Sequence, residues 1–404
     1  MKKSSLVLYV GVLGCLMSSV SFLKAEDTIS AMILRYFPQA DMNKDGVLSE
    51  KEEAFVSRQA MQRYPKADLD QDGTLSEEEK KQLLQRVIAL RNKKVDSSVA
   101  AKRSDGRATS SGRRKPSFEN MQYGEDERNV FDIWLAASQS PTPLAVYIHG
   151  GGFTSGSKDK LKKEKLEGLL DAGISVAAIN YRFRTTHSLP TAHHDARRAI
   201  QFMRSKADEW NIDKERVAAF GGSAGAQICM WLAYSDDMAD ATSDDPIERE
   251  STRLFCIATA GGQTSTEGEF YINNILPLLG DNVPIESLLS PLNGETDPEK
   301  IRMMTWGADT IEAANETARQ CSALHLISSD DPPIFMSYGM SPDARKPNDR
   351  KRLRGWLIHH VVFGTSLKEK ADHLGVEADL FYPGANSIYP SDVAFFRDKL
   401  LRVE

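Results

Sequence analysis

Ser223 has the surroundings that a nucleophilic hydroxyl needs. It lies in Gly221-Gly222-Ser223-Ala224-Gly225, directly after an apolar run that ends at Phe220. A serine on a sharp strand-to-helix turn needs small neighbours, because bulky side chains would clash where the backbone folds back. The helix expected after the turn would offer unpaired N–H groups and a favourable dipole to an oxyanion. The pattern therefore predicts a nucleophile at Ser223.

A second glycine cluster follows an earlier apolar run. Leu144–Ile148 leads into His149-Gly150-Gly151-Gly152-Phe153, where glycines let backbone amides approach a substrate oxygen. The N–H groups of Gly150, Gly151 and Ala224 are the predicted oxyanion hole. Each cluster alone could be an ordinary tight turn, but their order and their places after strands favour an α/β-hydrolase.

These motifs, together with Asn180-Tyr181-Arg182, resemble the hormone-sensitive-lipase and feruloyl-esterase-like branches of the α/β-hydrolases. The resemblance covers residues 119–404. It implies carboxylic ester cleavage through an acyl-enzyme on Ser223. It also implies a helical cap at about residues 261–317, whose apolar residues would line the pocket and set acyl preference; these are Phe270, Tyr271, Ile275, Leu276, Leu278 and Leu279.

The other two members of the catalytic triad depart from this family pattern. The expected acid position holds Pro342, and Asp343 one residue later is the predicted acid. Where the family has Pro-Gly-Ala-Gly-His, the chain reads Pro383-Gly384-Ala385-Asn386-Ser387, and no histidine follows His373. Serine is a poor nucleophile without a base. His359 and His360 follow the acid loop, and His360 is the predicted base with His359 as its alternative.

A repeat with an offset of 27 residues predicts two calcium-binding EF-hand loops. Asp41-Met42-Asn43-Lys44-Asp45-Gly46 and Asp68-Leu69-Asp70-Gln71-Asp72-Gly73 begin loops that end at Glu52 and Glu79. Calcium needs six to eight oxygen ligands, and such a loop supplies them from alternate positions. The predicted metal ligands are Asp41, Asn43, Asp45, Val47 and Glu52 in the first loop, and Asp68, Asp70, Asp72, Thr74 and Glu79 in the second. An acidic solvated turn is the simpler alternative.

The spacing of apolar runs indicates how these residues are positioned. Runs with β-branched content occur at 130–135, 144–149, 174–180, 217–220, 254–258, 333–338 and 376–382. Helix-length amphipathic stretches lie between several of them, notably 192–210 and 366–374. Alternating strands and helices predict a mostly parallel sheet with helices on both faces, and sites in such sheets lie at the carboxyl ends of the strands.

The start of the chain has the layout of a secretory signal. Lys2 and Lys3 precede an apolar stretch from Leu6 to Leu23, and Ala25 follows. We therefore expect export to the periplasm or medium, with a lipidated Cys15 or a retained membrane anchor as alternatives. A membrane partner is expected only in those two cases. Of the remaining cysteines, Cys229 and Cys256 lie between apolar residues, and buried thiols are favoured over one disulfide.

The predicted domains are a signal peptide (1–25), a small all-α EF-hand pair (27–96), a flexible basic linker (97–118) and the hydrolase domain (119–404). The linker could instead be a patch for anionic polysaccharide or phospholipid. With 404 residues, 41% hydrophobic, and a net charge of −6, the chain gives no reason to expect a nucleic-acid partner. The expected function is that of an exported, calcium-binding carboxylesterase for small or carbohydrate-linked esters. Two alternatives are a hydrolase fold without turnover that binds such ligands, and an interaction protein that works through its EF-hands.

Overall fold

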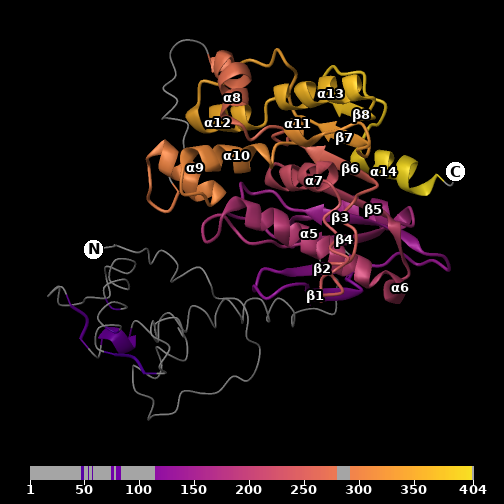
Figure 1. The fold of residues 1–404 in the computed structure, drawn as a ribbon, viewed down its shortest axis with the longest axis horizontal. Helices are drawn as coiled ribbons and strands as arrows, with labels where there is room; N and C mark the ends of the chain where they lie inside the picture. Colours follow the sequence, from indigo (N-terminus) through magenta and orange to yellow (C-terminus); the bar gives the residue numbers. More distant parts are fainter. Residues whose placement is uncertain are drawn as a thin grey trace, which may run out of the picture. The chain divides into compact units, whose positions relative to one another are not determined.

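The computed structural model describes residues 47–49, 53, 57, 74–76, 79–82, 114–279 and 292–402. The chain divides into two compact units, residues 1–112 and residues 113–404. Figure 1 shows the described elements of the larger unit, in which a sheet is surrounded by helices.

Within the described residues, the larger unit contains a sheet of eight strands. They are β1 (Phe118–Gln122), β2 (Val130–Trp134), β3 (Thr142–Ile148), β4 (Ser175–Ile179), β5 (Ile212–Gly222), β6 (Cys256–Ala260), β7 (Ile334–Ser337) and β8 (Ala378–Phe381). Their order is β1-β2-β4-β3-β5-β6-β7-β8. β2 pairs antiparallel with β1 and β4, and the other pairs are parallel. The expected strands and the mostly parallel sheet are confirmed. β1 had no clear signal, because four of its five residues are exposed.

Helices connect most of the strands. The longer ones are α4 (Lys163–Asp171), α5 (Leu189–Ser205), α7 (Ala224–Tyr234), α9 (Pro298–Trp306), α10 (Ile311–Arg319), α12 (Arg350–Ile358), α13 (Val362–Leu374) and α14 (Asp392–Leu401). The short ones are η3 (Lys158–Lys160), α6 (Ala207–Trp210), α8 (Gly268–Phe270), η4 (Tyr271–Ile275), η5 (Leu276–Leu279) and α11 (Ala323–Leu326). Side-chain caps start several helices; Asp297, Thr310 and Ser391 accept backbone N–H bonds at α9, α10 and α14.

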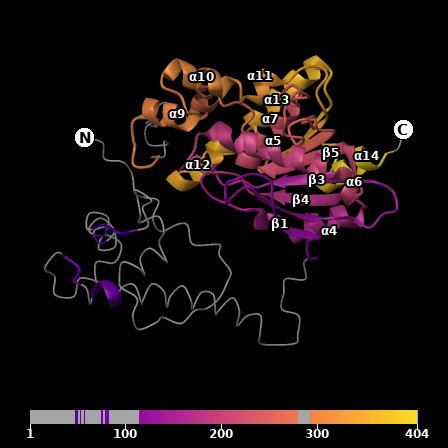
Figure 2. The ribbon, with the colours of Figure 1, turned by 60° about the horizontal axis from the view of Figure 1, so that its bottom comes forward.

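The two faces of the sheet carry separate apolar clusters. Because side chains alternate along a strand, Ile257 of β6 joins one cluster while Cys256 and Ala258 join the other. The larger cluster lies under α5, α7 and α13, and the smaller one lies under α4 and α14. Figure 2 shows α5 and α7 on one side of the sheet and α4 on the other. Cys229, Cys256 and Cys321 are buried free thiols, which is the alternative that the sequence favoured over a disulfide.

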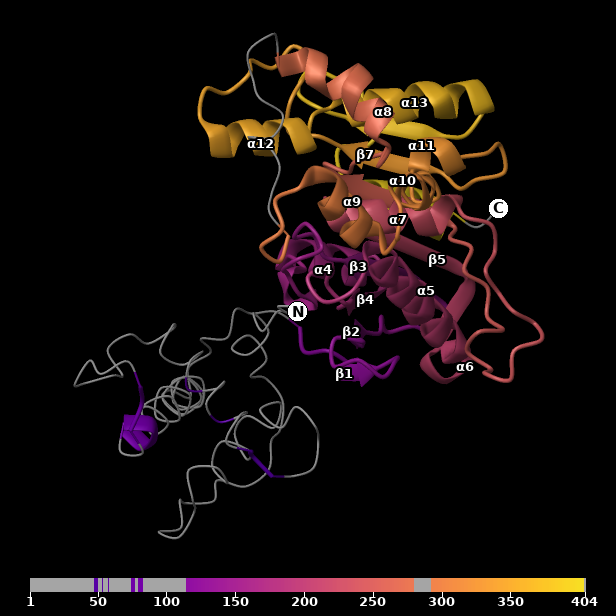
Figure 3. The same cartoon turned by 60° about the vertical axis from the view of Figure 1, so that its left-hand side comes forward.

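The segment between β6 and β7 carries α8 to α11, in the region where the cap was expected. Its apolar residues were expected to line a pocket, but in the structure they pack against the core. Phe270 stacks on Phe363 of α13 with ring centroids 5.2 Å apart, and α8 lies beside α13 in Figure 3. Ile275 and Leu279 are buried, while Phe270, Tyr271, Leu276 and Leu278 pack against the core. In the described part of this segment, these side chains belong to the core or pack against it, and none of them lines the cavity beside Ser223.

The N-terminal unit is described only in fragments, and these fragments relate the two repeats to each other. Leu48 and Leu75, at the same place in each repeat, are both buried. Lys80 and Glu53 also hold matching places, 27 residues apart, and form an ion pair of 2.8 Å. Ser76 and Glu79 form a capping box, since the Ser76 N–H donates to Glu79 Oε2 at 2.9 Å. The signal peptide and most of the linker lie outside the described residues. No helix in the described part of the chain is long and apolar enough to cross a membrane.

Candidate active site

Ser223 lies on the turn between β5 and α7, with φ +53° and ψ −118°. Non-glycine residues rarely adopt such a backbone conformation, and it persists only where surrounding contacts impose it. One such contact is the bond from the Ser223 N–H to the carbonyl oxygen of Ala260, at 2.9 Å. The turn holds the side chain at the carboxyl end of the sheet, as the sequence predicted for a nucleophile.

The glycines around Ser223 are required by space. A Cβ atom at Gly221 would lie 2.5 Å from the carbonyl oxygen of Ile148, and one at Gly225 would overlap the same oxygen. β5 and α7 can therefore meet β3 this closely only when both positions lack a side chain. This explains the spacing of the motif in physical terms.

The first glycine loop packs directly against this turn. A Cβ atom at Gly150 would lie 2.6 Å from the carbonyl oxygen of Gly222. Ala224 is the first residue of α7, where N–H groups have no acceptor within the helix. The loop of Gly150 and Gly151 thus adjoins the start of α7, which is the arrangement that an oxyanion hole needs.

His149 and Arg128 hold the glycine loop in place. The His149 ring is fully buried and stacks on Tyr181 at 4.2 Å, and its Nδ1 lies 2.8 Å from the Gly150 carbonyl oxygen. Arg128 Nη2 lies 3.4 Å from His149 Nε2 and donates to the Gly156 carbonyl at 3.2 Å. Burial lowers the pKa of His149 to about 4, so the ring is neutral and supports the loop. No motif in the sequence indicated a role for Arg128, which lies between β1 and β2.

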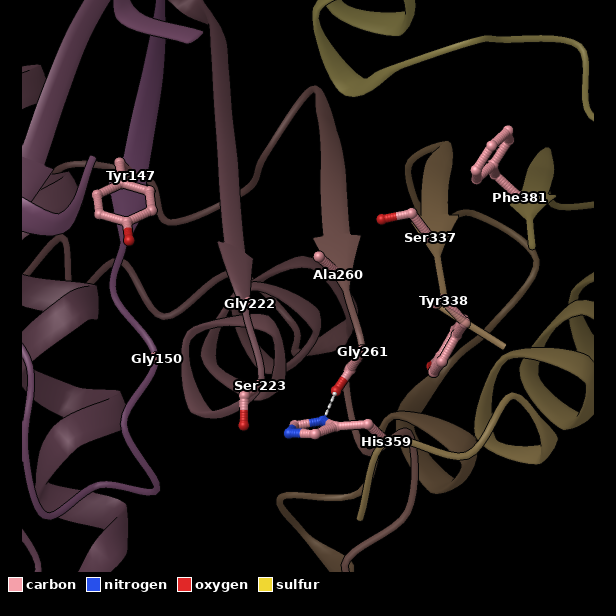
Figure 4. Close-up of a pocket in the computed structure, with 11 residues that line it drawn as sticks. Tyr147, Gly150, Gly222, Ser223, Ala260, Gly261, Ser337, Tyr338, His359 and Phe381 are labelled. Carbon is pink, nitrogen blue, oxygen red and sulfur yellow. Dashed lines mark hydrogen bonds between the residues drawn. The ribbon is translucent and has the colours of Figure 1, made fainter. Parts of the chain in front are cut away.

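A cavity of about 630 Å³ opens beside Ser223. Its lining residues are Tyr147, Gly150, Gly222, Ser223, Ala260, Gly261, Ser337, Tyr338, Gly339, His359 and Phe381. Five of them form what we call the rim row, the last residue on one face of each of five adjacent strands: Tyr147, Gly222, Ala260, Ser337 and Phe381. Figure 4 shows the rim row above Ser223 and His359. Among the described residues, no carboxylate lines the cavity.

His359 brings an imidazole into this cavity. It is the C-cap residue of α12, and its Nδ1 lies 2.8 Å from the carbonyl oxygen of Gly261. The other ring nitrogen points toward the Ser223 hydroxyl (Figure 4). Ser223 follows β5, and Gly261, whose carbonyl oxygen contacts His359, follows the neighbouring strand β6. Two adjacent strands therefore position the serine and the carbonyl group that His359 contacts.

The predicted acid and base lie elsewhere. His360 is buried, with its ring 4.6 Å from that of Trp356, and it does not line the cavity. Asp343 is exposed, and the Ser341 hydroxyl lowers the pKa of its carboxyl by hydrogen bonding. Two adjacent histidines therefore have different surroundings, and it is His359 that faces the serine.

The loop after β8, where the family pattern has its histidine, is bound to Asp379. The Ser387 hydroxyl donates to Asp379 Oδ2 at 2.7 Å, and the N–H groups of Ile388 and Tyr389 donate to the same carboxylate at 3.1 and 3.0 Å. None of these three loop residues lines the cavity. The serine at position 387 is thus part of a local structural contact.

The sequence model of the BD-FAE family matches residues 131–357, more than half of the chain. The chain belongs to the BD-FAE family. The matched range contains both glycine motifs and ends just before His359. The family assignment thus covers Ser223 and the glycine loop at 149–153, and it does not extend to His359.

Curated relatives match shorter stretches. Esterase LipC of Mycobacterium tuberculosis is 26% identical over 136 residues, which is 33% of this chain and 32% of that protein. The ethyl acetate hydrolase of Pseudomonas putida is 35% identical over 88 residues, 22% of this chain and 28% of that protein. The chain thus spans about a third of the length of these relatives.

A bifunctional GH43-CE protein of Bacteroides eggerthii has a similar solved structure, with TM-score 0.50 and 16% sequence identity. The likeness covers 70% of this chain and 38% of that one. At this identity it bears on the fold alone. With the family match and the observed sheet, it confirms the predicted α/β-hydrolase fold.

Of the predicted calcium ligands, three belong to the described residues. Val47 is exposed, Thr74 lies at the matching place of the second loop, and Glu79 is the second loop's final position. Asp41, Asn43, Asp45, Glu52, Asp68, Asp70 and Asp72 lie outside the described residues. Where the structure describes the chain, no group of three or more acidic, histidine or cysteine side chains could hold a metal.

Proposed function

We propose that the protein hydrolyses carboxylic esters through an acyl-enzyme on Ser223, with His359 as general base. One observation carries the proposal: the Ser223 hydroxyl, on a strained turn, faces an imidazole across a cavity that also contains Gly150. Nucleophilic hydroxyls in enzymes need a base within hydrogen-bond reach and preformed donors for the oxyanion. The names of the curated relatives support the same reaction class.

The chemistry follows from these positions. Ser223 Oγ attacks the ester carbonyl carbon, and its proton passes to His359 Nε2. The N–H groups of Gly150, Gly151 and Ala224 stabilise the oxyanion. The protonated imidazole then gives its proton to the departing alcohol, which leaves an acyl-enzyme. Water repeats the sequence, releases the acid and restores the serine.

Turnover of a short-chain aryl ester tests the proposal. Ser223→Ala should abolish it, and His359→Ala should lower kcat by about 10⁶-fold, because the oxyanion hole and substrate binding alone leave only about 10³- to 10⁴-fold acceleration over water. The matched control is His360→Ala, which removes the adjacent imidazole and should keep kcat close to the wild-type value. A fluorophosphonate probe should label Ser223 in the control and fail to label it in His359→Ala. Equal activity in all three variants would refute the proposal.

The substrates proposed are small esters, with carbohydrate-linked esters as a second class to be screened. The relative named ethyl acetate hydrolase supports the first class. The cavity of about 630 Å³ has room for more than an acetyl group, which supports screening the second. Measuring kcat/KM on acetylated sugars and on short alkyl esters decides which class the protein prefers.

A ligand-binding protein without turnover is the second candidate function. The observation in its favour is that no carboxylate, among the described residues, lines the cavity. If this candidate is right, the fluorophosphonate probe leaves Ser223 unlabelled, while short esters still bind in equilibrium titrations. Labelling of Ser223 would exclude it.

We also propose that the N-terminal repeats bind calcium. The buried Leu48 and Leu75 and the Lys80–Glu53 ion pair at matching places support a paired arrangement of the two loops. The predicted oxygen donors suit a hard cation, which prefers carboxylate and carbonyl ligands. Millimolar calcium should raise the melting temperature of the N-terminal unit, because a ligand that binds only the folded state stabilises it. Glu79→Gln should reduce this shift, and a wild-type protein without any shift would refute the proposal.

The N-terminal segment is proposed to direct export, with cleavage after Ala25 as the first expectation. The lysine pair, the apolar stretch and the small residue support this. Mass spectrometry of the protein recovered from an expressing cell tests it. A mature chain beginning near Glu26 is expected, whereas a lipidated Cys15 or an intact first residue would identify the anchored alternatives.

A further inference from the structure

Among the described residues, no carboxylate contacts the histidine in the cavity. In a serine hydrolase triad, an acid fixes the tautomer of the base and stabilises the imidazolium that forms. The atom that contacts His359 Nδ1 at 2.8 Å is instead the main-chain carbonyl oxygen of Gly261. Asp343 is exposed and does not line the cavity.

A carbonyl oxygen can only accept a hydrogen bond, so the 2.8 Å contact requires the proton to be on Nδ1. Gln263 Nε2 also lies near Nδ1, at the longer distance of 3.3 Å. The amide N–H groups of Gln263 have other acceptors, because they also donate to the carbonyl oxygens of Ile358 and Gly261. The shorter contact therefore decides the tautomer, and Nε2 presents its lone pair to Ser223.

Gln263 fastens the end of α12 to the segment after β6. Its Nε2 contacts the carbonyl of Ile358, directly before His359, and its Oε1 accepts from Gln227 Nε2 at 3.2 Å. Gln227 lies in α7, one turn after Ser223. The side chain is buried, so these bonds are shielded from water. One amide thus links the helix that follows the nucleophile to the helix that carries the imidazole.

We propose that the Gly261 main-chain carbonyl takes the place of the triad carboxylate and orients His359, with Gln263 as the positioning residue that holds both. This rests on the proposed ester hydrolysis. During acylation the serine proton moves to Nε2, while the Nδ1 proton stays in its bond to Gly261. By accepting the Nδ1 proton, the carbonyl keeps His359 in the tautomer that can act as a base. Because the carbonyl is a dipole and carries no full negative charge, it stabilises the imidazolium less than a carboxylate would.

Nitrogen NMR of protein labelled with ¹⁵N-histidine tests the tautomer without reference to turnover. The His359 signals, assigned by their absence in His359→Ala, should show a protonated Nδ1 and an unprotonated Nε2 at neutral pH. A protonated Nε2 would overturn the inference even if the protein hydrolyses esters. Conversely, an Nδ1–H tautomer in a protein without esterase activity would refute the proposed function and leave the orienting contact intact.

Gly261→Ala tests whether the contact matters for catalysis. Gly261 has φ +56°, and an added Cβ atom would lie 3.1 Å from His359 Nδ1, so the ring must shift. Displacing a catalytic group by about 1 Å can lower the rate by about 10²-fold; because relieving this contact needs a smaller shift, we expect a fall in kcat of about 10-fold with KM unchanged. Gly173→Ala is the control: it has φ +82° and nothing within 4 Å of the added atom. It carries similar backbone strain and should keep kcat. Equal kcat in both variants would overturn the proposal.

Gln263→Glu and Gln263→Leu separate orientation from packing. Glutamate would place a carboxylate beside Nδ1 and favour the protonated ring, so the acid limb of the kcat/KM profile should move to higher pH. Gln263→Leu keeps the volume but removes the amide, and should lower kcat without moving that limb. If kcat/KM fell by the same factor at every pH in both variants, Gln263 would act only in packing, and the proposal would be contradicted.

Discussion

The Ser387 hydroxyl donates a hydrogen bond to the Asp379 carboxylate at 2.7 Å. Ser387 stands where the family pattern would place its catalytic histidine, and Asp379 is a buried residue of β8. The carboxylate also accepts two backbone N–H bonds from the same loop. The position that the sequence pointed to is therefore bound to the sheet, and the imidazole in the cavity comes from α12.

We predict that Ser387→His will not restore activity to His359→Ala. The N–H groups of Ile388 and Tyr389 still hold the loop on Asp379, so the new imidazole remains away from Ser223. The measurement is kcat of the double variant against His359→Ala alone, with Ser387→His alone as the control for folding. A return to the wild-type rate would show that this loop reaches the cavity.

The buried ion pair of Lys158 and Asp132 should be sensitive to loss of one partner. Lys158 Nζ lies 2.7 Å from Asp132 Oδ2, and both side chains are buried. Lys158→Met leaves a buried carboxylate without its cation, which typically lowers the free energy of unfolding by about 3–5 kcal/mol. Urea titration checks this. In the matched double variant Asp132→Leu/Lys158→Met neither charge remains, so its loss should be smaller; an equal or larger loss would contradict the argument.

Stability should fall as the pH decreases from 6.5 toward 4, because His193 is buried as a neutral ring. Its pKa is lowered by burial to about 4, and its Nε2 has no partner among the described residues. The unfolded chain binds this proton near pH 6.5 and the folded chain does not. Each such histidine thus removes about 1.4 kcal/mol per pH unit in that range.

Melting temperatures measured between pH 7 and pH 4 test this behaviour. His193→Gln should flatten the dependence, and His149 should account for part of the remaining slope because burial also lowers its pKa to about 4. The surface residue His325 gives the control, since His325→Gln should leave the slope unchanged. A slope identical in all three proteins would contradict the assignment.

Two helical glycines should respond in opposite directions to alanine. At Gly364 in α13 an added Cβ atom would overlap the Tyr338 ring, and it would lie 2.8 Å from Leu380 Cδ1. Overpacking of this kind typically lowers stability by about 1–3 kcal/mol. At Gly355 in α12 nothing lies within 4 Å, so Gly355→Ala should raise stability by up to about 1 kcal/mol through helix propensity. Urea midpoints of the two variants measure both signs.

The sheet and the serine turn could be predicted from the sequence because both depend on local patterns. Buried strands such as β4 appear in the sequence as short apolar runs, and the Ser223 turn needs small residues at fixed spacing. The choice between His359 and His360 could not be made in this way. It depends on the carbonyl of Gly261, 98 residues earlier in the chain, and no local pattern specifies that contact.

The contacts of the residues expected in the cap could not be predicted for a related reason. An apolar side chain such as Phe270 fits a substrate pocket and a core equally well in the sequence. The structure decides for the core, since Phe270 stacks on Phe363. Arg128 shows the same limitation, because its support of the glycine loop depends on His149 and Tyr181, which are distant in sequence.

Within the described residues, the C-terminal segment from β8 through α14 contributes Phe381 to the cavity wall and Phe395 and Phe396 to the core, and none of its ionisable side chains lines the cavity. Substitutions at Phe381 therefore change the shape of the cavity, whereas substitutions at Phe395 or Phe396 act through packing. Under the proposed mechanism, the end of α12 is constrained by the chemistry of one imidazole as well as by packing.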